Sequence, residues 1–486
     1  MIYKLRPYQE ECVKSISDYI NSDRHDPVLI VGPVGCGKSL LIAEAARLMG
    51  DKTLILQPSK ELLQQNHDKI TSYGIPATIY SASFGKKELS NMIYATLGSI
   101  KKVVSQLKEM GIRNVLIDEA HAGYSPEDGS EFMTFMNELK PRKVIGFTAT
   151  PCRLKNMSIG QTSYSQLNFI TRMRPVYFKN LIHVIQVEEM IRQGFWTPLK
   201  YETWDFNGDA LKLNSNGSEY TAESISEAVR KNGLNNLILR RLMVLKDVCR
   251  SILVFMDSVE SCNTAAEWMN AKICAGMAEV VHGGTPKKQR EAIVERFKSG
   301  KTKVVFNYSA LGTGFDHPGL DCVIVGRPTF SFSSFYQWLG RAVRIKDGKD
   351  SALVVDCCNN SSRFGDIRKL SIENYKGYGW GMFIGDKLIT NIPMGDKVTK
   401  TDLDIKAAKK DRRRGLAQGV TAAPVPGRPD HPLGSTVMTF GKYCGWMFHS
   451  IPVSYFKFIN ETFDWDNDRN KDIKEYIDFL IKNNRL

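Results

Sequence analysis

The sequence of 486 residues lacks any pair of cysteines at C-x-x-C spacing and lacks a long apolar run. Its ten cysteines are spread along the chain, and the neighbours Cys357 and Cys358 have no second pair at the spacing of a zinc site. Because structural zinc needs about four ligands grouped in this way, we expect no zinc and predict reduced, buried thiols. No stretch approaches the roughly 18 apolar residues that cross a bilayer, and no stretch at the start resembles a signal peptide. We therefore expect an intracellular, cytoplasmic protein that makes no contact with a membrane.

Acidic residues are fewer than basic residues. The chain has 66 Lys and Arg residues against 52 Asp and Glu residues, a formal net charge of +14. A basic excess of this size favours a polyanionic partner, of which nucleic acid is the commonest. A merely basic soluble protein is the alternative that charge leaves open. The apolar share of 42% is that of an ordinary globular protein with a sizeable core.

Short β-branched runs alternate with helical patterns over the first 150 residues, and the alternation restarts near residue 250. This pattern predicts an α/β fold of two tandem units, each with a parallel sheet covered on both faces. We place the first domain at 1–165 and the second at 166–400, with a polar inserted segment at 207–223. Residues 401–434 are basic and then rich in Pro and Gly, which predicts a linker. Residues 435–486 form a small C-terminal module.

The stretch "GPVGCGKS", residues 32–39, matches G-x-x-x-x-G-K-[ST] between an apolar run and a helical pattern. Glycines in such a loop let backbone N–H groups surround phosphates at the N-terminus of a helix. The lysine adds a point charge for the β- and γ-phosphates, and the serine hydroxyl suits Mg²⁺. The residues that we expect to hold the nucleotide here are Gly35, Cys36, Gly37, Lys38 and Ser39.

Two adjacent carboxylates follow the apolar run in "LIDEAH", residues 116–121. The carboxyl end of a strand in an open parallel sheet faces the ligand crevice. Asp118 is therefore the expected anchor for Mg²⁺, and Glu119 the expected base that orients or deprotonates the attacking water. An exposed strand end without a role is the alternative.

Two cations lie three positions apart in "QWLGRAVR", residues 337–344. Residues i and i+3 share a face of a helix, so we predict that Arg341 and Arg344 point the same way. Two neighbouring cations repel, which indicates an anion opposite them. A solvated basic helix face is the alternative.

The motifs "GPVGCGKS", "IDEAH", "TAT" (148–150) and "QWLGRAVR" resemble, in order and spacing, motifs I, II, III and VI of superfamily 2 helicases of the DEAH type. The resemblance covers residue 3 to about 360. "LRPYQ" (5–9) looks like the Q motif of these helicases. Further segments look like their other motifs: "QPSKELLQQ" (57–65), "YATLGSI" (94–100), "LVFMDS" (253–258), "HGGTPKKQREAIVERFKSG" (282–300) and "NYSALGTGFDHPGLDCVI" (307–324).

Within this superfamily the chain looks most like the RadD and UvsW branch of DNA-processing helicases. RadD-type proteins carry a cysteine-rich zinc segment that this chain lacks, so a phage relative is favoured. The C-terminal "FGKYCG" resembles a small module at the end of exonuclease X-like proteins. Its aromatic residues are expected to be mostly core, with a DNA-binding add-on as the alternative.

The resemblance implies two RecA-like lobes with ATP in the cleft between them. Gln337, Arg341 and Arg344 would act on the phosphates from the second lobe, so hydrolysis would depend on closure of the lobes. Arg6 and Gln9 would bind the adenine side, and Asp316 and Gly314 would lie near the ribose. Coupling of the ATP site to the strand would fall to His121, Thr148 and Thr150. The candidate nucleic-acid contacts are Ser59, Thr96, Ser258, His282 and Thr313.

We therefore predict an ATP-hydrolysing DNA helicase or branch-migration translocase of a bacterial or phage-infected cell, acting on forked or branched DNA with replication or recombination proteins as further partners. ATP and Mg²⁺ are the expected cofactors. An RNA helicase, or the non-unwinding motor subunit of a nuclease or restriction complex, is the alternative. The acidic stretch at 464–475 departs from a calcium loop because Arg469 stands where the turn needs Gly, so no calcium is expected.

Overall fold

The computed structural model describes residues 4–50, 52–159, 162–311, 315–407, 431–436, 438, 443, 446–462, 471–483 and 485. The chain divides into two compact units. The first contains residues 1–375 and 379–398, and the second contains residues 376–378 and 399–486. No helix within the described ranges combines the length and the apolar character that crossing a membrane requires.

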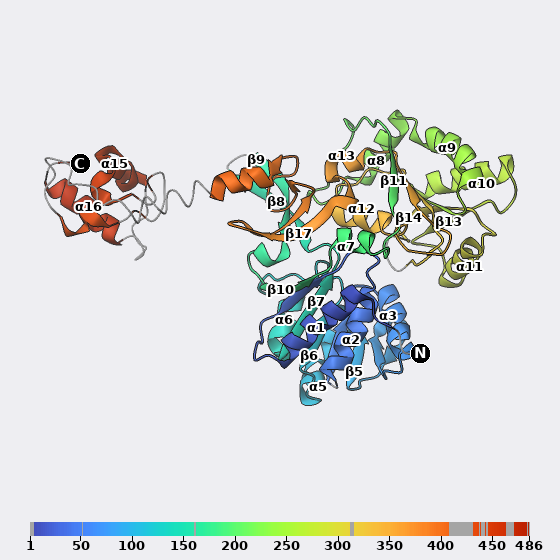
Figure 1. The fold of residues 1–486 in the computed structure, drawn as a ribbon, viewed down its shortest axis with the longest axis horizontal. Coiled ribbons are helices and arrows are strands. Elements are labelled where there is room, and N and C mark those ends of the chain that lie inside the picture. Colours follow the sequence, from blue (N-terminus) through green and yellow to red (C-terminus); the bar gives the residue numbers. More distant parts are fainter. Residues whose placement is uncertain are drawn as a thin grey trace. The chain divides into compact units, whose positions relative to one another are not determined.

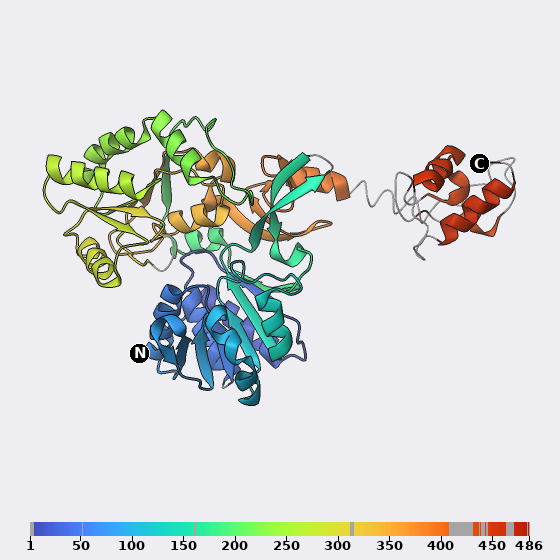
Figure 2. The same cartoon turned by 180° about the vertical axis from the view of Figure 1, so that it is seen from behind.

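The first sheet of the larger unit has eight strands in the order β10-β1-β7-β6-β2-β5-β3-β4. All neighbours are parallel except β3 and β4. Continuous apolar runs such as Val28–Val31 are wholly buried because helices cover both faces of the sheet (Figures 1 and 2). The strands are β1 (Val28–Val31), β2 (Thr53–Leu56), β3 (Thr78–Ser81), β4 (Lys86–Lys87), β5 (Met92–Ala95), β6 (Asn114–Ile117), β7 (Lys143–Thr148) and β10 (Asn180–Val184). The helices are α1 (Pro7–Asn21), α2 (Lys38–Met49), α3 (Lys60–Ser72), α4 (Leu97–Ile100), α5 (Val104–Glu109), α6 (Glu131–Leu139) and α7 (Val187–Arg192).

The second sheet has six parallel strands in the order β11-β16-β15-β12-β14-β13. Its strands are β11 (Leu199–Thr203), β12 (Ile252–Phe255), β13 (Ala278–His282), β14 (Val304–Tyr308), β15 (Cys322–Val325) and β16 (Ala352–Asp356). The accompanying helices are α8 (Ala222–Lys231), α9 (Leu234–Val248), α10 (Val259–Lys272), α11 (Lys287–Lys298), α12 (Phe332–Leu339) and α13 (Asn360–Phe364). The predicted fold class, α/β with two parallel sheets in tandem, is confirmed. We call the parts built around the two sheets the first lobe and the second lobe.

The first sheet reaches beyond residue 165, where we expected the first domain to end. Strand β10 pairs with β1, so the chain returns to the first sheet before it enters the second lobe. Residue 165 itself lies within an antiparallel hairpin of β8 (Cys152–Ile159) and β9 (Thr162–Phe169). The boundary is displaced because a parallel edge strand is added after the hairpin, a crossover that composition does not reveal.

Two segments singled out in the sequence take different forms. Residues 207–223 form a loop closed by one backbone bridge between Leu213 and Tyr220. The glycine-rich and aromatic stretch from residue 371 instead folds as an antiparallel sheet of β17 (Leu370–Tyr375), β18 (Gly379–Ile384) and β19 (Lys387–Leu388), which continues to β20 (Val398–Thr399). We call β17, β18 and β19 the accessory sheet. Segment 391–394 contacts β9 through hydrogen bonds from Asn391 N to Leu167 O (2.7 Å) and from Met394 N to Ser165 O (2.8 Å).

The described part of the second unit contains α15 (Val453–Thr462) and α16 (Lys471–Lys482), packed on a small apolar core. Phe448 and Phe456 are buried in that core as expected, whereas Trp446 is 51% exposed. Trp446 was expected to be mostly core, and the fifty-residue module buries only part of its aromatic set because its core is small. The expected linker begins with helical residues 400–407, and residues 408–430, including the basic "KKDRRR", lie outside the described residues.

Candidate active site

The loop between β1 and α2 has the backbone that its glycines predict. Gly35 and Gly37 have φ of +86° and +84°, backbone conformations that residues other than glycine rarely adopt. A Cβ on Gly37 would also lie 2.6 Å from Gln9 Nε2. Gly37 precedes α2 and supplies no side-chain cap to the first N–H groups of this helix, and Gly37, Lys38 and Ser39 line the cavity described below. This arrangement can hold phosphate.

Asp118 and Glu119 follow β6 and lie beside this loop. Asp118 is 5% exposed, and burial, followed by the neighbouring Glu119, raises the pKa of its carboxyl. Glu119 Oε1 lies 3.9 Å from Lys38 Nζ. Glu119 has φ of +44°, a strained value for a non-glycine residue. The strained turn sets the two carboxylates side by side at the end of one strand.

Asn66 of α3 joins the two predicted magnesium ligands, and sequence reasoning missed it. Its Oδ1 accepts a hydrogen bond from Ser39 Oγ (2.7 Å), and its Nδ2 donates to Asp118 Oδ2 (3.0 Å). Leu62, Gln65 and Lys69 line the same cavity. These four positions follow the 3–4 residue spacing of one helix face, which was the signal available in the sequence.

The second lobe contributes to the same cavity. A cavity of about 170 Å³ is lined by the loop, Asp118 and Glu119 from the first lobe and by Asp316, Gln337, Arg341 and Arg344 from the second. Arg344 Nε lies 3.5 Å from Asp316 Oδ1. Arg341 Nη1 donates to Phe315 O (2.6 Å), and burial, followed by Arg344, lowers the pKa of Arg341 to about 10. Four cations from two lobes therefore line one cavity: Lys38, Lys69, Arg341 and Arg344.

The expectation that Arg341 and Arg344 share a helix is wrong. Helix α12 ends at Leu339, and Gly340 follows it as the C-cap. A Cβ on Gly340 would lie 2.6 Å from Val34 Cγ2 of the phosphate loop, so the chain turns where the lobes are closest. The turn still delivers both guanidinium groups to the cavity.

Trp196 also holds the phosphate loop against the second lobe. Its Nε1 donates to Val34 O (2.8 Å), and the ring is 1% exposed. The next residue, Thr197, donates from its hydroxyl to Arg344 O (2.7 Å). One short segment thus contacts the loop that faces the cavity and the turn that carries the arginines.

The predicted coupling residues form a closed ring of hydrogen bonds with Ser333 of α12. His121 Nδ1 lies 2.8 Å from Thr148 Oγ1, and His121 Nε2 lies 3.1 Å from Ser333 Oγ. Ser333 Oγ lies 3.2 Å from Thr150 Oγ1, and Thr150 N donates to Thr148 Oγ1 (3.0 Å). Burial lowers the pKa of His121, so the imidazole is neutral and offers one donor and one acceptor. Sequence reasoning missed Ser333, which is four positions before Gln337.

Three predicted nucleotide-binding residues lie outside the lining of the cavity. Gln9 is 4% exposed, and its Nε2 donates to Cys36 O (2.9 Å) while its Oε1 accepts from Arg6 N (3.0 Å). The Arg6 guanidinium lies 4.6 Å from the centre of the Phe195 ring. Gln9 therefore contacts the phosphate loop at Cys36, and Arg6 contacts Gln9 and Phe195. Gly314 lies outside the described residues.

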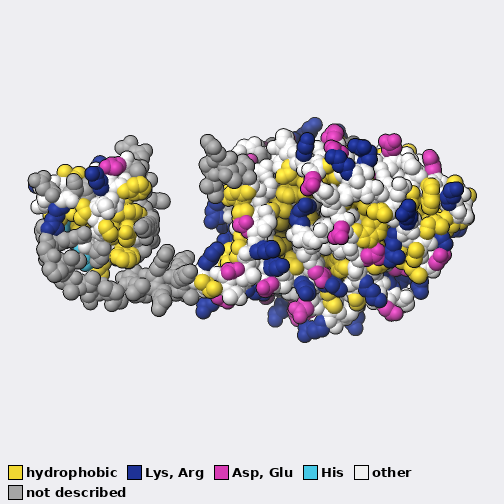
Figure 3. Space-filling model, turned by 90° about the horizontal axis from the view of Figure 1, so that it is seen from above, with side chains coloured by type: hydrophobic (Ala, Val, Ile, Leu, Met, Phe, Trp, Pro, Cys, Tyr) yellow, Lys and Arg dark blue, Asp and Glu magenta, His cyan; other side chains and the backbone are white. Residues whose placement is uncertain are grey.

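The candidate nucleic-acid contacts lie at or just after the carboxyl ends of parallel strands: Ser59 after β2, Thr96 after β5, Ser258 after β12 and His282 at the end of β13. Ser59 and Ser258 cap α3 and α10 by accepting from Leu62 N (3.3 Å) and Ser261 N (3.0 Å). Thr96 Oγ1 donates to Ser99 Oγ (3.1 Å), His282 Nδ1 accepts from Gly284 N (3.1 Å), and Thr313 lies outside the described residues. Lys and Arg side chains are spread over the face in Figure 3 rather than concentrated in one patch. The basic side chains on this face therefore do not outline one path for a nucleic-acid strand.

The cavity residues fit the magnesium and nucleotide that the motifs imply. The Ser39 hydroxyl and the Asp118 carboxylate are hard oxygen ligands that Mg²⁺ prefers, and both contact Asn66. Glu119 Oε2 is buried and has no hydrogen-bond partner within the described part of the chain, although His121 Nδ1 lies 3.4 Å away. A buried carboxylate oxygen without a donor is costly unless a ligand completes it. Among the described residues, no group of three or more His, Cys, Asp or Glu side chains is arranged to hold a metal.

Comparison with known proteins identifies the class. Residues 2–153 match the family described as type III restriction enzyme, res subunit, and residues 235–346 match the helicase conserved C-terminal domain. The chain is a member of helicase superfamily 2, which confirms the family predicted from the motifs.

Individual relatives are distant. The chain is 26% identical to a "51.5 kDa protein" of a Lactococcus phage, over 68% of this chain and 65% of that protein. It is 22% identical to the "Putative ATP-dependent helicase IRC3" of Saccharomyces cerevisiae, over 74% of this chain and 52% of that protein. A solved structure of the "ATP-dependent Type ISP restriction-modification enzyme LlaBIII bound to DNA" shares the fold, with a TM-score of 0.53 and 15% identity over 86% of this chain and 30% of that one. The chain thus spans less than two thirds of the length of these relatives.

Proposed function

We propose that this protein hydrolyses ATP to move along DNA, as a helicase or branch-migration translocase. One observation carries the proposal: the cavity of about 170 Å³ is lined by Lys38 and Glu119 of the first lobe and by Arg341 and Arg344 of the second. Phosphoryl transfer needs neutralised charge and a positioned water more than covalent chemistry. Cations from two lobes make hydrolysis depend on how the lobes meet, which is what a motor requires.

In this proposal the described residues divide the work. Lys38 and the N–H groups at the start of α2 bind the phosphates, and Ser39 and Asp118 hold Mg²⁺, which neutralises phosphate charge when bound. Glu119 accepts the proton of the attacking water or orients that water. Arg341 and Arg344 stabilise the charge that develops on the phosphoryl oxygens, and Gln337 lines the cavity beside them. Gln9 and Arg6 act on the adenine side or through the phosphate loop.

DNA as the track is a finer part of the proposal. It is supported by the resemblance to the RadD and UvsW branch and by the neighbour whose title describes it as bound to DNA. The resemblance also favours forked or branched DNA and a role in replication, recombination or repair. The C-terminal module, with its likeness to exonuclease X-like proteins, is then an added DNA-binding element.

Two tests separate the alternatives. ATP hydrolysis would be measured with forked DNA, single-stranded DNA and RNA of equal length. We expect DNA to stimulate, with the fork strongest, and stimulation by RNA alone would refute the DNA assignment. Strand separation on a labelled fork and displacement of a triplex strand from duplex DNA would follow. Triplex displacement without strand separation would favour the motor subunit of a restriction complex, a reading that the restriction-modification neighbour also fits.

A further inference from the structure

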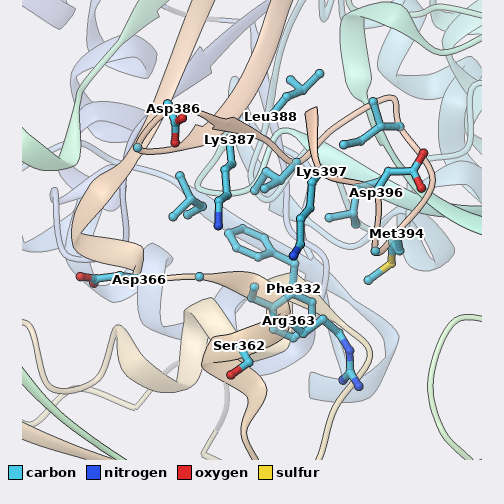
Figure 4. Close-up of a pocket in the computed structure, with 18 of the residues that line it drawn as sticks. Phe332, Ser362, Arg363, Asp366, Asp386, Lys387, Leu388, Met394, Asp396 and Lys397 are labelled. Carbon is cyan, nitrogen blue, oxygen red and sulfur yellow. The ribbon is translucent and has the colours of Figure 1, made fainter. Parts of the chain in front are cut away.

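A second hollow in the larger unit shares no residue with the cavity described above. It has a volume of about 510 Å³, and we call it the accessory pocket. Its walls come from the start of α12, from residues 362–369 beside α13, from the end of β18 with β19, and from segment 392–397 (Figure 4). Pockets that hold small organic ligands span roughly 300–1,000 Å³, so its size suits such a ligand.

The floor of the accessory pocket is apolar and partly aromatic. Phe332, Phe364, Ile384 and Leu388 line it and are 1%, 4%, 9% and 2% exposed. The rings of Phe332 and Phe364 pack edge to face, with centroids 5.8 Å apart. Met394 adds a thioether at the side of the floor. A flat, weakly polar group is the best match for such a surface.

The rim of the pocket is basic. Arg363, Lys369, Lys387 and Lys397 line it, and all four are exposed. Lys387 and Lys397 extend from two different segments toward the middle of the pocket (Figure 4). No carboxylate among the described residues lies within the 4.0 Å of an ion pair with any of the three lysines.

The acidic residues of the pocket only partly offset this charge. The lining includes Asp366, Asp386 and Asp396. Asp366 already pairs with Arg368, whose Nη2 lies 2.6 Å from Asp366 Oδ2. Four cations therefore face two other carboxylates, an arrangement that an anion would stabilise.

We propose that the accessory pocket binds a nucleotide unit, with the phosphate between Lys387 and Lys397 and the base on the apolar floor. A nucleotide combines the two chemistries that the pocket presents, a flat ring for the floor and an anion for the rim. Its source is either a strand of nucleic acid or a free nucleotide. A nucleic-acid strand is the source that we favour, and this choice rests on the proposed function.

The pocket is placed to influence the ATP site. Phe332 of its floor directly precedes Ser333, whose hydroxyl contacts His121 and Thr150. Arg363 of its rim lies over the rings of Tyr220 and Phe330 at 5.4 Å and 5.6 Å, which fixes that wall to the loop at 207–223. A ligand in the pocket therefore contacts α12, the helix whose Ser333 takes part in the ring of hydrogen bonds between the two lobes.

Photocrosslinking of the full chain tests the proposal. The probes are a single-stranded oligothymidylate with 5-iodouracil at each position in turn and free 5-iododeoxyuridine monophosphate. Irradiated iodouracil reacts with aromatic and sulfur side chains, which the floor offers in Phe332, Phe364 and Met394. We expect crosslinked peptides within residues 362–397 or at Phe332, mapped by mass spectrometry. Crosslinks confined to other segments would overturn the proposal.

Charge reversal supplies the matched comparison. Lys387→Glu with Lys397→Glu should reduce the crosslink at least tenfold and lower the slope of log affinity against log salt by about one unit or more. Lys108→Glu with Arg113→Glu, two exposed cations at the far end of α5, changes the net charge equally and should leave the crosslink in place. An equal crosslink in the two double variants would overturn the proposal. An oligonucleotide with abasic sites should compete poorly, because it offers the rim a phosphate and the floor no base.

The outcomes keep this inference apart from the proposed function. If the wild-type chain binds DNA but crosslinks elsewhere, only the accessory pocket is wrong. If it crosslinks the free nucleotide here but neither binds DNA nor is stimulated by it, the pocket stands and the DNA motor falls. Crosslinking by the oligonucleotide but not by the free monophosphate identifies the strand as the source.

Discussion

Ser333 and His121 belong to different lobes, and Ser333 Oγ lies 3.1 Å from His121 Nε2. The contact closes a ring that also contains Thr148 and Thr150, both fully buried residues of the first lobe. Because Glu119 lies 3.4 Å from the same imidazole, the ring reaches from the second lobe to the expected catalytic carboxylate. A shift of α12 would therefore move His121 and change the surroundings of Glu119.

Substitution of Ser333 by Ala tests this connection. The change removes one hydroxyl with contacts to His121 and Thr150, so we expect a loss of about 1 kcal/mol in the free energy of unfolding. Stimulation of ATP hydrolysis by DNA should fall several-fold, measured as the ratio of rates with and without DNA. Ser334→Ala is the matched control, because Ser334 lies next to Ser333 and its hydroxyl contacts Ser331 instead. Equal stimulation ratios in the two variants would contradict the coupling role.

Glu119→Gln tests the expected base. The amide keeps the size of the side chain but cannot accept the proton, so hydrolysis should fall by about 10²–10⁴-fold. Nucleotide binding, measured by fluorescence with a labelled ATP analogue, should stay within a few-fold because Lys38 and the phosphate loop remain. Glu109→Gln, an exposed change on α5, should alter neither quantity. Retained hydrolysis in Glu119→Gln would refute the assigned role.

Arg344→Ala tests whether Arg344 stabilises the transition state of ATP hydrolysis or only binds ATP. Arg344 is 35% exposed, and its one ion pair among the described residues is with Asp316 at 3.5 Å, so its removal should cost little stability. The hydrolysis rate should fall on the order of 10³-fold with affinity for ATP near normal. Arg113→Ala, at an exposed arginine of the first lobe, should leave the rate unchanged. A loss of affinity that matches the loss of rate would place Arg344 in binding alone.

Asp118 predicts a pH dependence of stability in the protein without metal or nucleotide. Burial raises its pKa to about 7, whereas the unfolded carboxyl titrates near 4. Between these values the folded state holds the extra proton, so stability should fall as pH rises through this window, by an amount on the order of 1–3 kcal/mol. Thermal unfolding from pH 5 to pH 8 measures the slope.

Asp118→Asn removes the titrating group and should flatten that slope. Asp18→Asn, on the exposed face of α1, should leave it as in the wild type. A slope of the same size in Asp118→Asn would show that another group titrates in this range.

The sequence made the ATP site accessible to prediction because its motifs are local. One cavity is lined by five residues of the loop at 32–39, by Asp118 and Glu119, and by Arg341 and Arg344, while the roles expected of these residues stay predictions. Asn66 and Ser333 were missed because their roles depend on which helix faces the cavity, a tertiary property. The helix expected to carry both arginines ends at Leu339 because Gly340 meets Val34 of the other lobe, a contact that no local pattern records.

Gln9 has contacts that its motif did not predict. The motif drew attention to its amide, but the structure uses both ends of that amide inside the chain, at Cys36 and Arg6. Its role in adenine binding stays a prediction. The first domain was likewise extended by β10, since an edge strand added after a hairpin has no signature in composition.

The size of the cavity between the lobes has a kinetic consequence. The cavity of about 170 Å³ is smaller than the pockets of roughly 300–1,000 Å³ that enclose organic ligands. A whole nucleotide needs more space, so we expect Val34 and Gly340, which both line the cavity, to move apart when one binds. The hydrogen bond from Trp196 Nε1 to Val34 O holds the wall that would move, so the side chain at position 196 would affect entry and release of nucleotide without contacting the nucleotide.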